Sequence, residues 1–174
     1  MPSLYAIPYY SKYLGVATSG ILTGILLTHS TTITPLLLAS PSHSIILRQF
    51  HSLQTPSKKK TITRLSLSSS LFFFTASYLR VTKSWPSTIR CWIAGVLAIS
   101  VIPYSWLVMK RTERKLEALY EEEVEGKVEA EKEGQVVVRG EVRGLVDWWG
   151  LVNLGRVGAA GAAFLVGIET VRRW

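Results

Sequence analysis

The sequence predicts an all-α membrane protein, a four-helix bundle with a charged helical extension between its third and fourth helices. Hydrophobic residues make up 48% of the 174 residues and charged residues only 18%, below the roughly 25% that is usual for soluble domains. The apolar residues gather in blocks that are separated by charged or Ser/Pro-rich stretches. No acidic residue precedes Glu113, whereas basic residues occur throughout. This pattern is typical of a membrane chain with flanking bases, and we treat residues 1–174 as one membrane domain.

Four segments are long enough to cross a bilayer, whose core needs roughly 20 helical residues. The predicted spans are residues 13–38, 62–81, 90–109 and 145–168. The first contains no formal charge, and Gly20 and Gly24 form a step of small residues that lets another helix come close. The second is the least hydrophobic, because it contains a run of serines, and serine hydroxyls are tolerated where they bond a helix carbonyl. Residues 45–53, before it, predict a short interfacial helix.

The third predicted span, residues 90–109, has tryptophans near both ends, where indole rings favour the membrane interface, and Pro103 predicts a bend near its far end. Residues 110–144 form a polar insertion that we interpret as a solvated extension of the third helix; a docking helix for another protein is the alternative. The fourth span contains small residues at every fourth position, from Gly155 to Gly167, which predicts a smooth packing ridge. The distribution of Lys and Arg predicts that both termini face away from the cytosol.

The fourth span also contains the most informative polar residues. Trp149, Asn153 and Arg156 stand at i, i+4 and i+7 and therefore share one helix face. A charge at mid-membrane costs about 2.5–3.5 kcal/mol, so it normally faces the bundle interior and has a partner. That partner is a backbone carbonyl, a side chain of another helix such as Tyr104 or His29, or an anionic ligand. Asn153 and Arg156 therefore either hold helices together or take part in ligand binding or catalysis. A third reading is that Arg156 snorkels to the membrane surface.

Several classes of site are disfavoured. His29, His43 and His51 have no metal-ligand spacing and no Cys or carboxylate cluster near them, so no metal site is expected. Cys91 is the one cysteine and cannot form an internal disulfide. The single basic run, residues 58–60, sits between apolar segments, so nucleic acid is not an expected partner. His29 is the only histidine within a span, where it is either a packing residue or a base.

Two short motifs resemble one family of membrane proteins. Ile102-Pro103-Tyr104-Ser105-Trp106-Leu107-Val108-Met109, followed by Thr112 and Leu116, is similar to the third-helix signature of the four-helix family that includes the fungal anthrone oxygenases. Trp149, Asn153 and Arg156 resemble the signature of its last helix. The family commonly has Pro-Thr-Asn where this chain has Arg111-Thr112-Glu113.

The resemblance implies oxidation of a polyketide anthrone to an anthraquinone by O₂, without cofactor. The implied catalytic residues are His29 as base and Asn153 and Arg156 as donors to an anionic oxygen, while Tyr104 and Trp149 would bind the substrate. The expected partners are membrane lipid, an aromatic polyketide and O₂, and a homo-oligomer stays open. The alternative is a non-enzymatic tetraspan protein that docks a partner through residues 110–144; a transporter subunit is a third reading. An endomembrane location is expected, with a mitochondrial membrane as the alternative.

Overall fold

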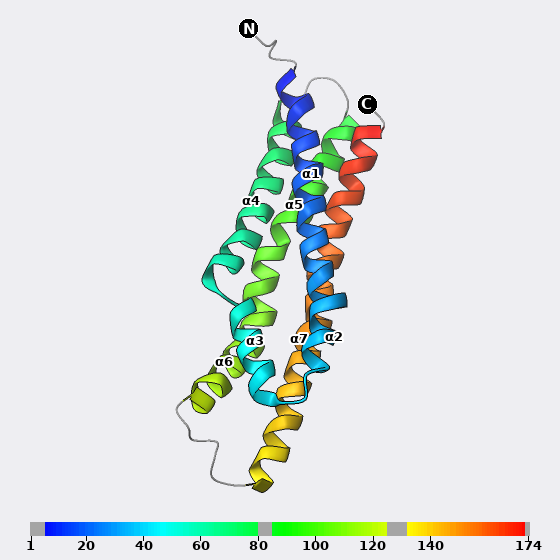
Figure 1. Cartoon of the computed structure of the whole chain (residues 1–174). Helices are drawn as coiled ribbons and strands as arrows, with labels where there is room; N and C mark the ends of the chain where they lie inside the picture. The colour runs from blue at the N-terminus through cyan, green and yellow to red at the C-terminus, as the bar shows by residue number, and fades with distance from the viewer. Residues whose placement is uncertain (1–5, 80–84, 125–131, 173–174) are drawn as a thin grey trace.

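The structure is a computed structural model that describes residues 6–79, 85–124 and 132–172, and these residues are nearly all helical. Four long helices lie side by side: α1 (Ala6–Thr28), α4 (Pro56–Tyr78), α5 (Trp85–Tyr104) and α7 (Lys132–Arg172). Helices α4 and α7 each contact both α1 and α5, which closes the four into a bundle (Figure 1). The prediction of an all-α membrane four-helix bundle is confirmed.

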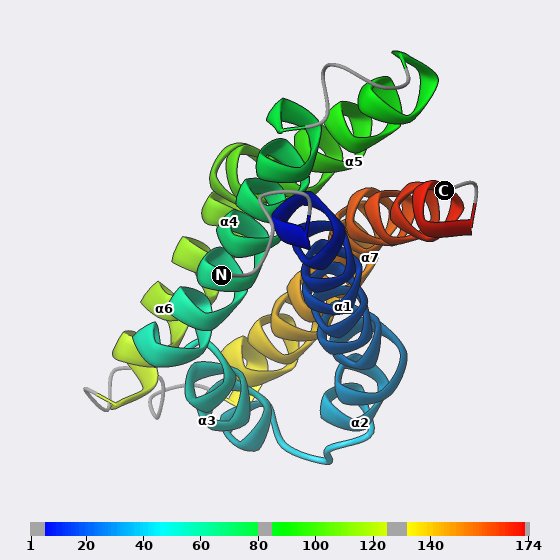
Figure 2. The same ribbon diagram turned by 90° about the horizontal axis from the view of Figure 1, so that it is seen from above.

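Shorter helical segments extend the bundle at one end. They are η1 (His29–Ile33) and α2 (Thr34–Leu38) after α1, α3 (His43–Leu53) before α4, and η2 (Ser105–Met109) and α6 (Lys110–Val124) after α5. Helices α2, α3 and α6 surround the lower part of α7, whereas the start of α1 and the end of α7 lie together at the other end (Figure 1). Viewed along the bundle, α3 and α6 flank one side of α7 and α2 the other (Figure 2).

The polar segments form more helix than the sequence predicted. The expected short helix is α3, two residues longer at its start than the predicted range. The expected extension of the third helix is α6, which continues from α5 through η2 without a break. The polar insertion is also helical on its far side, because α7 begins at Lys132 and runs for 41 residues. Residues 125–131 of the insertion lie outside the described part.

Among the residues that the structure describes, three helical stretches are long and apolar enough to cross a membrane: Ile7–Leu38, Ser87–Val124 and Gly140–Arg172. Helix α4, which corresponds to the second predicted span, is too polar on average to join them, and residues 80–81 of that span are not described. Its serines explain this composition. The buried Ser66 hydroxyl donates to the Ala98 carbonyl at 2.6 Å and the buried Ser69 hydroxyl to the Gly15 carbonyl at 3.2 Å. The buried serines of α4 therefore face its neighbours, whereas Thr63 and Arg64 nearer its start are exposed.

Two π-helical turns interrupt the long helices on either side of the bundle interior. In the first, the Thr34 hydroxyl donates to the His29 carbonyl five residues earlier, at 2.8 Å. The second, η2, follows Pro103 directly, at the position where the sequence predicted a bend. Single π turns inside α-helices occur frequently at functional sites. Here both turns contribute residues to one cavity.

Small residues on α7 allow other helices to approach closely. A Cβ at Gly167 would lie 2.8 Å from the Phe73 ring, and one at Gly150 would lie 2.5 Å from Thr34. The predicted ridge on α7 is therefore a packing surface. The predicted step on α1 is only half used: Gly20 packs against the Phe164 ring, but Gly24 has no atom within 4 Å of its Cβ position.

Candidate functional site

A cavity of about 320 Å³ lies where the apolar bundle meets its polar end. Its walls come from η1, the α3–α4 connection, α4, α5, η2, α6 and α7. The lining residues are His29, Leu53, Gln54, Lys59, Ile62, Thr63, Val101, Ile102, Ser105, Trp106, Lys110, Glu113, Trp149 and Arg156. The volume is at the lower end of the range for small-molecule pockets, roughly 300–1,000 Å³. The cavity is therefore suited to one compact ligand.

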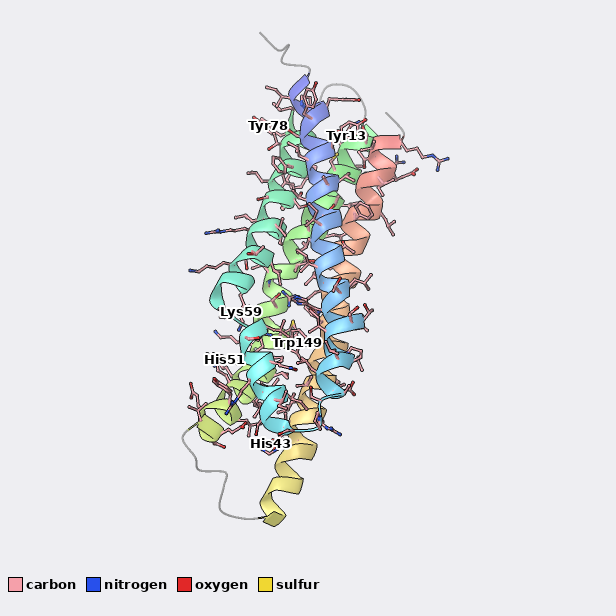
Figure 3. All side chains as sticks on the ribbon, viewed as in Figure 1. Tyr13, His43, His51, Lys59, Tyr78 and Trp149 are labelled. Atoms are coloured by element: carbon pink, nitrogen blue, oxygen red, sulfur yellow. The ribbon has the colours of Figure 1, made fainter. Side chains whose placement is uncertain are left out.

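The burial of the lining residues shows which side is open. Trp149, Arg156 and Val101 are buried and form the inner wall. Thr63 and Trp106 are exposed, from α4 and η2 respectively, so the mouth lies between these two elements. Figure 3 labels Trp149 and Lys59 in the same half of the bundle, far from Tyr13 and Tyr78 at the other end. The mouth thus opens sideways, close to the polar end.

Arg156 is held at the inner wall by neutral groups. Its Nη1 donates to the Met109 sulfur at 3.1 Å and to Asn153 Oδ1 at 3.2 Å. The contact with Asn153 follows from helix geometry, because side chains lean toward the helix N-terminus and meet residues three or four positions earlier. Its buried Nε has no hydrogen-bond acceptor in the described part of the chain. The Arg156 guanidinium therefore lies beside the cavity with an unused donor.

Asn153 is fully buried and connects α7 to the first helix. Its Nδ2 donates to the Leu26 carbonyl at 3.0 Å and to Ser30 Oγ at 2.8 Å. Its Oδ1 accepts from Arg156, so every atom of the amide head has a partner within the bundle. Asn153 lies outside the cavity lining. Asn153 therefore holds the Arg156 guanidinium in place and anchors α7 against α1 and η1.

Trp149 supplies an aromatic surface to the inner wall. It packs edge-to-face on Phe50, with ring centroids 5.3 Å apart and an interplanar angle of 86°. Its buried indole Nε1 has no hydrogen-bond acceptor among the described residues. A buried donor without a partner costs about 1–3 kcal/mol. A ligand oxygen that accepts from this group would remove that cost.

His29 reaches the same cavity from η1, on the far side from α4. Its ring centroid lies 6.4 Å from that of Trp149, with an interplanar angle of 33°. The structure thus brings together three of the five residues that the sequence singled out: His29, Trp149 and Arg156.

Tyr104 lies beside the cavity instead of lining it. Its hydroxyl donates to the Val152 carbonyl at 3.0 Å. The same hydroxyl rests against Gly155, where a Cβ would overlap it. Tyr104 therefore joins α5 to α7 one turn from Arg156. This contact determines how closely η2 approaches the guanidinium.

The mouth contains charged residues that the sequence analysis did not assign to a site. Lys59 Nζ and Glu113 Oε2 form an ion pair at 2.8 Å that links α4 to α6. The Lys110 ammonium lies over the Trp106 ring, 4.8 Å from its centroid. No pattern predicted the ion pair, because its partners are 54 positions apart. The family motif did include Met109, but its contact with Arg156 was not foreseen.

The donor set gives no indication of a metal centre: within the described residues, no group of three or more His, Cys, Asp or Glu side chains could hold an ion. Searches of curated proteins and of solved structures gave no match. A family model described as anthrone oxygenase matches residues 50–166, well over half of the chain. The matched range includes most of the cavity wall, with Met109, Trp149, Asn153 and Arg156. The chain therefore belongs to the anthrone oxygenase family.

Proposed function

We propose that the chain oxidises a flat tricyclic polyketide anthrone to the corresponding anthraquinone with O₂, in the cavity between α4, η2 and α7. Family membership supports the reaction class. The cavity supports it by its size, its apolar inner wall and its few converging polar groups, which are the usual features of a small-molecule site. The proposed reaction needs neither metal nor flavin.

The chemistry starts from the acidity of the anthrone methylene, because loss of its proton gives an extended aromatic phenolate. This electron-rich anion transfers one electron to O₂, and the resulting radical and superoxide combine to a peroxide anion at the former methylene carbon. This anion takes back the proton that the base removed and becomes a hydroperoxide. Loss of water then leaves a carbonyl group. Overall, one CH₂ group and one O₂ become one C=O group and one water. The protein must therefore take up a proton and stabilise the anionic oxygen.

The observation that carries the proposal is a pair of unused buried donors. Trp149 Nε1 and Arg156 Nε both lack an acceptor among the described residues, and both residues line the inner wall. Preorganised donors aimed at developing negative charge are usually the largest single contribution to catalysis. A phenolate oxygen of the substrate placed at this wall would accept hydrogen bonds from both groups. Binding of the anion would then replace two unsatisfied groups by charge-assisted hydrogen bonds.

His29 is proposed as the base, since it lines the cavity from η1, across from the mouth. Trp149 is proposed to bind the substrate through its indole N–H, which lies in the plane of the ring, and not by stacking on the flat ring system. The hydrogen bonds of Asn153 favour a positioning role for this residue, because its amide is already engaged with Leu26, Ser30 and Arg156. Tyr104 is likewise proposed as a positioning residue, which holds α5 against α7.

The test is oxidation of 1,8-dihydroxyanthrone by the purified chain in detergent, followed by quinone absorbance and by oxygen uptake. The wild-type chain should form quinone faster than buffer. Arg156→Gln should lower kcat by about 10²-fold or more, the usual effect of removing one such donor. Arg64→Gln is the matched control, because Arg64 is exposed on α4 and lies outside the cavity. Gel filtration checks that both variants stay folded.

A wild-type rate equal to that of buffer with several anthrones would refute the proposal. A folded Arg156→Gln variant with full activity would refute the role proposed for Arg156. Deletion of residues 117–139 separates the enzyme from the docking protein that the sequence left open. An enzyme should keep its oxidation rate after this deletion, because none of the residues in this range that the structure describes lines the cavity.

A further inference from the structure

We propose that the ligand of this cavity carries a carboxylate in addition to its phenolic oxygens, and that Lys110 binds this carboxylate at the mouth. The inference rests on the proposed function for the tricyclic body of the ligand. It adds the substrate class, an acidic anthrone instead of a neutral one, and it assigns Lys110 as the residue that determines this specificity.

The first argument is the charge balance of the lining. The cavity is lined by three cationic side chains, Lys59, Lys110 and Arg156, but by one carboxylate, that of Glu113. The carboxylate is already paired with Lys59 at 2.8 Å. Lys110 and Arg156 therefore face the cavity without a direct ion pair among the described residues, although the charge of Glu113 also acts on Arg156. An occupant with two anionic groups matches this surplus better than an occupant with one.

The second argument is the contact that Lys110 makes. Its ammonium lies over the Trp106 ring at 4.8 Å, and it forms no ion pair within the described residues. An ammonium has three N–H donors, and a ring face satisfies none of them as an oxygen would. The ring nevertheless restricts the ammonium to one wall of the mouth. Lys110 is thus positioned with its hydrogen-bonding capacity unused, which is the state expected of a ligand-binding lysine.

The third argument is the placement of the two cations. Met109 contacts Arg156 at the inner wall, while its neighbour Lys110 lies at the mouth beside Trp106. Met109 and Lys110 are consecutive residues, and Lys110 and Arg156 line the same cavity. A ligand whose inner oxygen lies at Arg156 can therefore place an outer group at Lys110 without spanning the whole cavity. Carboxylate is the simplest outer group that accepts charge-assisted hydrogen bonds from an ammonium.

The test uses two quinones that are not turned over and that differ by one carboxyl group: 1,8-dihydroxyanthraquinone and its 3-carboxyl derivative. Binding is measured by quenching of tryptophan fluorescence in a maltoside detergent and a phosphate-free buffer, so that no lipid phosphate competes. The wild-type chain should bind the acid about tenfold or more tightly than the neutral quinone, the gain expected of a charged hydrogen bond. Lys110→Gln should reduce this ratio to below threefold. Lys60→Gln, at an exposed position outside the cavity, should retain it.

Equal binding of the two quinones by the wild-type chain would overturn the inference and assign Lys110 to lipid headgroups or solvent. An unchanged preference in Lys110→Gln would overturn it as well, and so would a loss of preference in Lys60→Gln. The oxidation assay tests the proposed function separately. A preference for the carboxyl quinone without anthrone oxidation would support this inference and refute the proposed reaction. Anthrone oxidation without such a preference would support the reaction and refute this inference.

Discussion

Gly155 is the position where one added methyl group should do the most damage to the bundle. It lies on α7 opposite Tyr104 of α5, and a Cβ there would overlap the tyrosine hydroxyl. That hydroxyl donates to the Val152 carbonyl at 3.0 Å. Gly155→Ala must therefore push the Tyr104 side chain away, break this hydrogen bond and separate α5 from α7. The displacement falls one turn from the guanidinium of Arg156.

The expected size of the effect follows from three contributions. Overpacking of a well-filled contact costs about 1–3 kcal/mol. The lost hydrogen bond adds about 0.5–1.5 kcal/mol. Replacement of Gly by Ala in a helix offsets up to about 1 kcal/mol of this. We expect a net loss of about 2 kcal/mol in the free energy of unfolding, together with slower anthrone oxidation because η2 moves relative to the inner wall.

Reversible denaturation of the detergent-solubilised chain measures the loss. Gly158→Ala is the matched control on the same helix, because no atom lies within 4 Å of its Cβ position. This control should be neutral or up to about 1 kcal/mol more stable. Tyr104→Leu removes both the overlapping oxygen and the ring carbon that bears it, which would lie 2.7 Å from the new Cβ. The double variant Gly155→Ala, Tyr104→Leu should therefore recover at least about 1 kcal/mol relative to additivity.

Equal stabilities of the Gly155→Ala and Gly158→Ala variants would refute the reasoning, because they differ mainly in the Tyr104 contact. Strict additivity in the double variant would also refute it. In that case the damage at Gly155 would come from another cause than the contact with Tyr104.

Two further predictions concern buried polar contacts. Asn153→Ala removes two donors and the oxygen that holds the guanidinium, so it should cost about 2 kcal/mol of unfolding free energy and slow oxidation; a fully stable and fully active variant would contradict the positioning role. Ser66→Ala removes a buried bond to α5 and should cost about 1 kcal/mol in denaturation experiments, whereas the half-buried Ser68→Ala should stay within about 0.5 kcal/mol; equal effects of the two would contradict the inward-facing role of Ser66.

Hydropathy predicted the long helices well because it depends on composition alone. The spans around α1, α5 and α7 contain few charges, and each matches a stretch long and apolar enough for a membrane. Helix α4 shows the limit of the method. Ser66 and Ser69 lower its mean hydropathy, yet both are buried against neighbouring helices. A window average does not distinguish a polar inner face from a polar outer face.

The π turns and the contacts between residues far apart in the chain could not be predicted from the sequence. A π turn adds one residue to a helix without changing its composition, so only Pro103 indicated a departure from regular helix, near η2, and nothing indicated η1. The shared helix face of Trp149, Asn153 and Arg156 was predictable from the 3.6-residue period. Their partners were not, because those partners are set by how the helices pack against one another.

The neutral partners of Arg156 have a consequence for how the chain enters a bilayer during synthesis. A lone helix that carries a charge at mid-depth inserts at a cost of about 2.5–3.5 kcal/mol. Helix α7 follows α1, α4 and α5 in the chain and is therefore synthesised after them. The Met109 sulfur, the Leu26 carbonyl and the Ser30 hydroxyl thus already exist when α7 is made. A circular permutant that begins with α7 would have to insert its guanidinium before those partners exist.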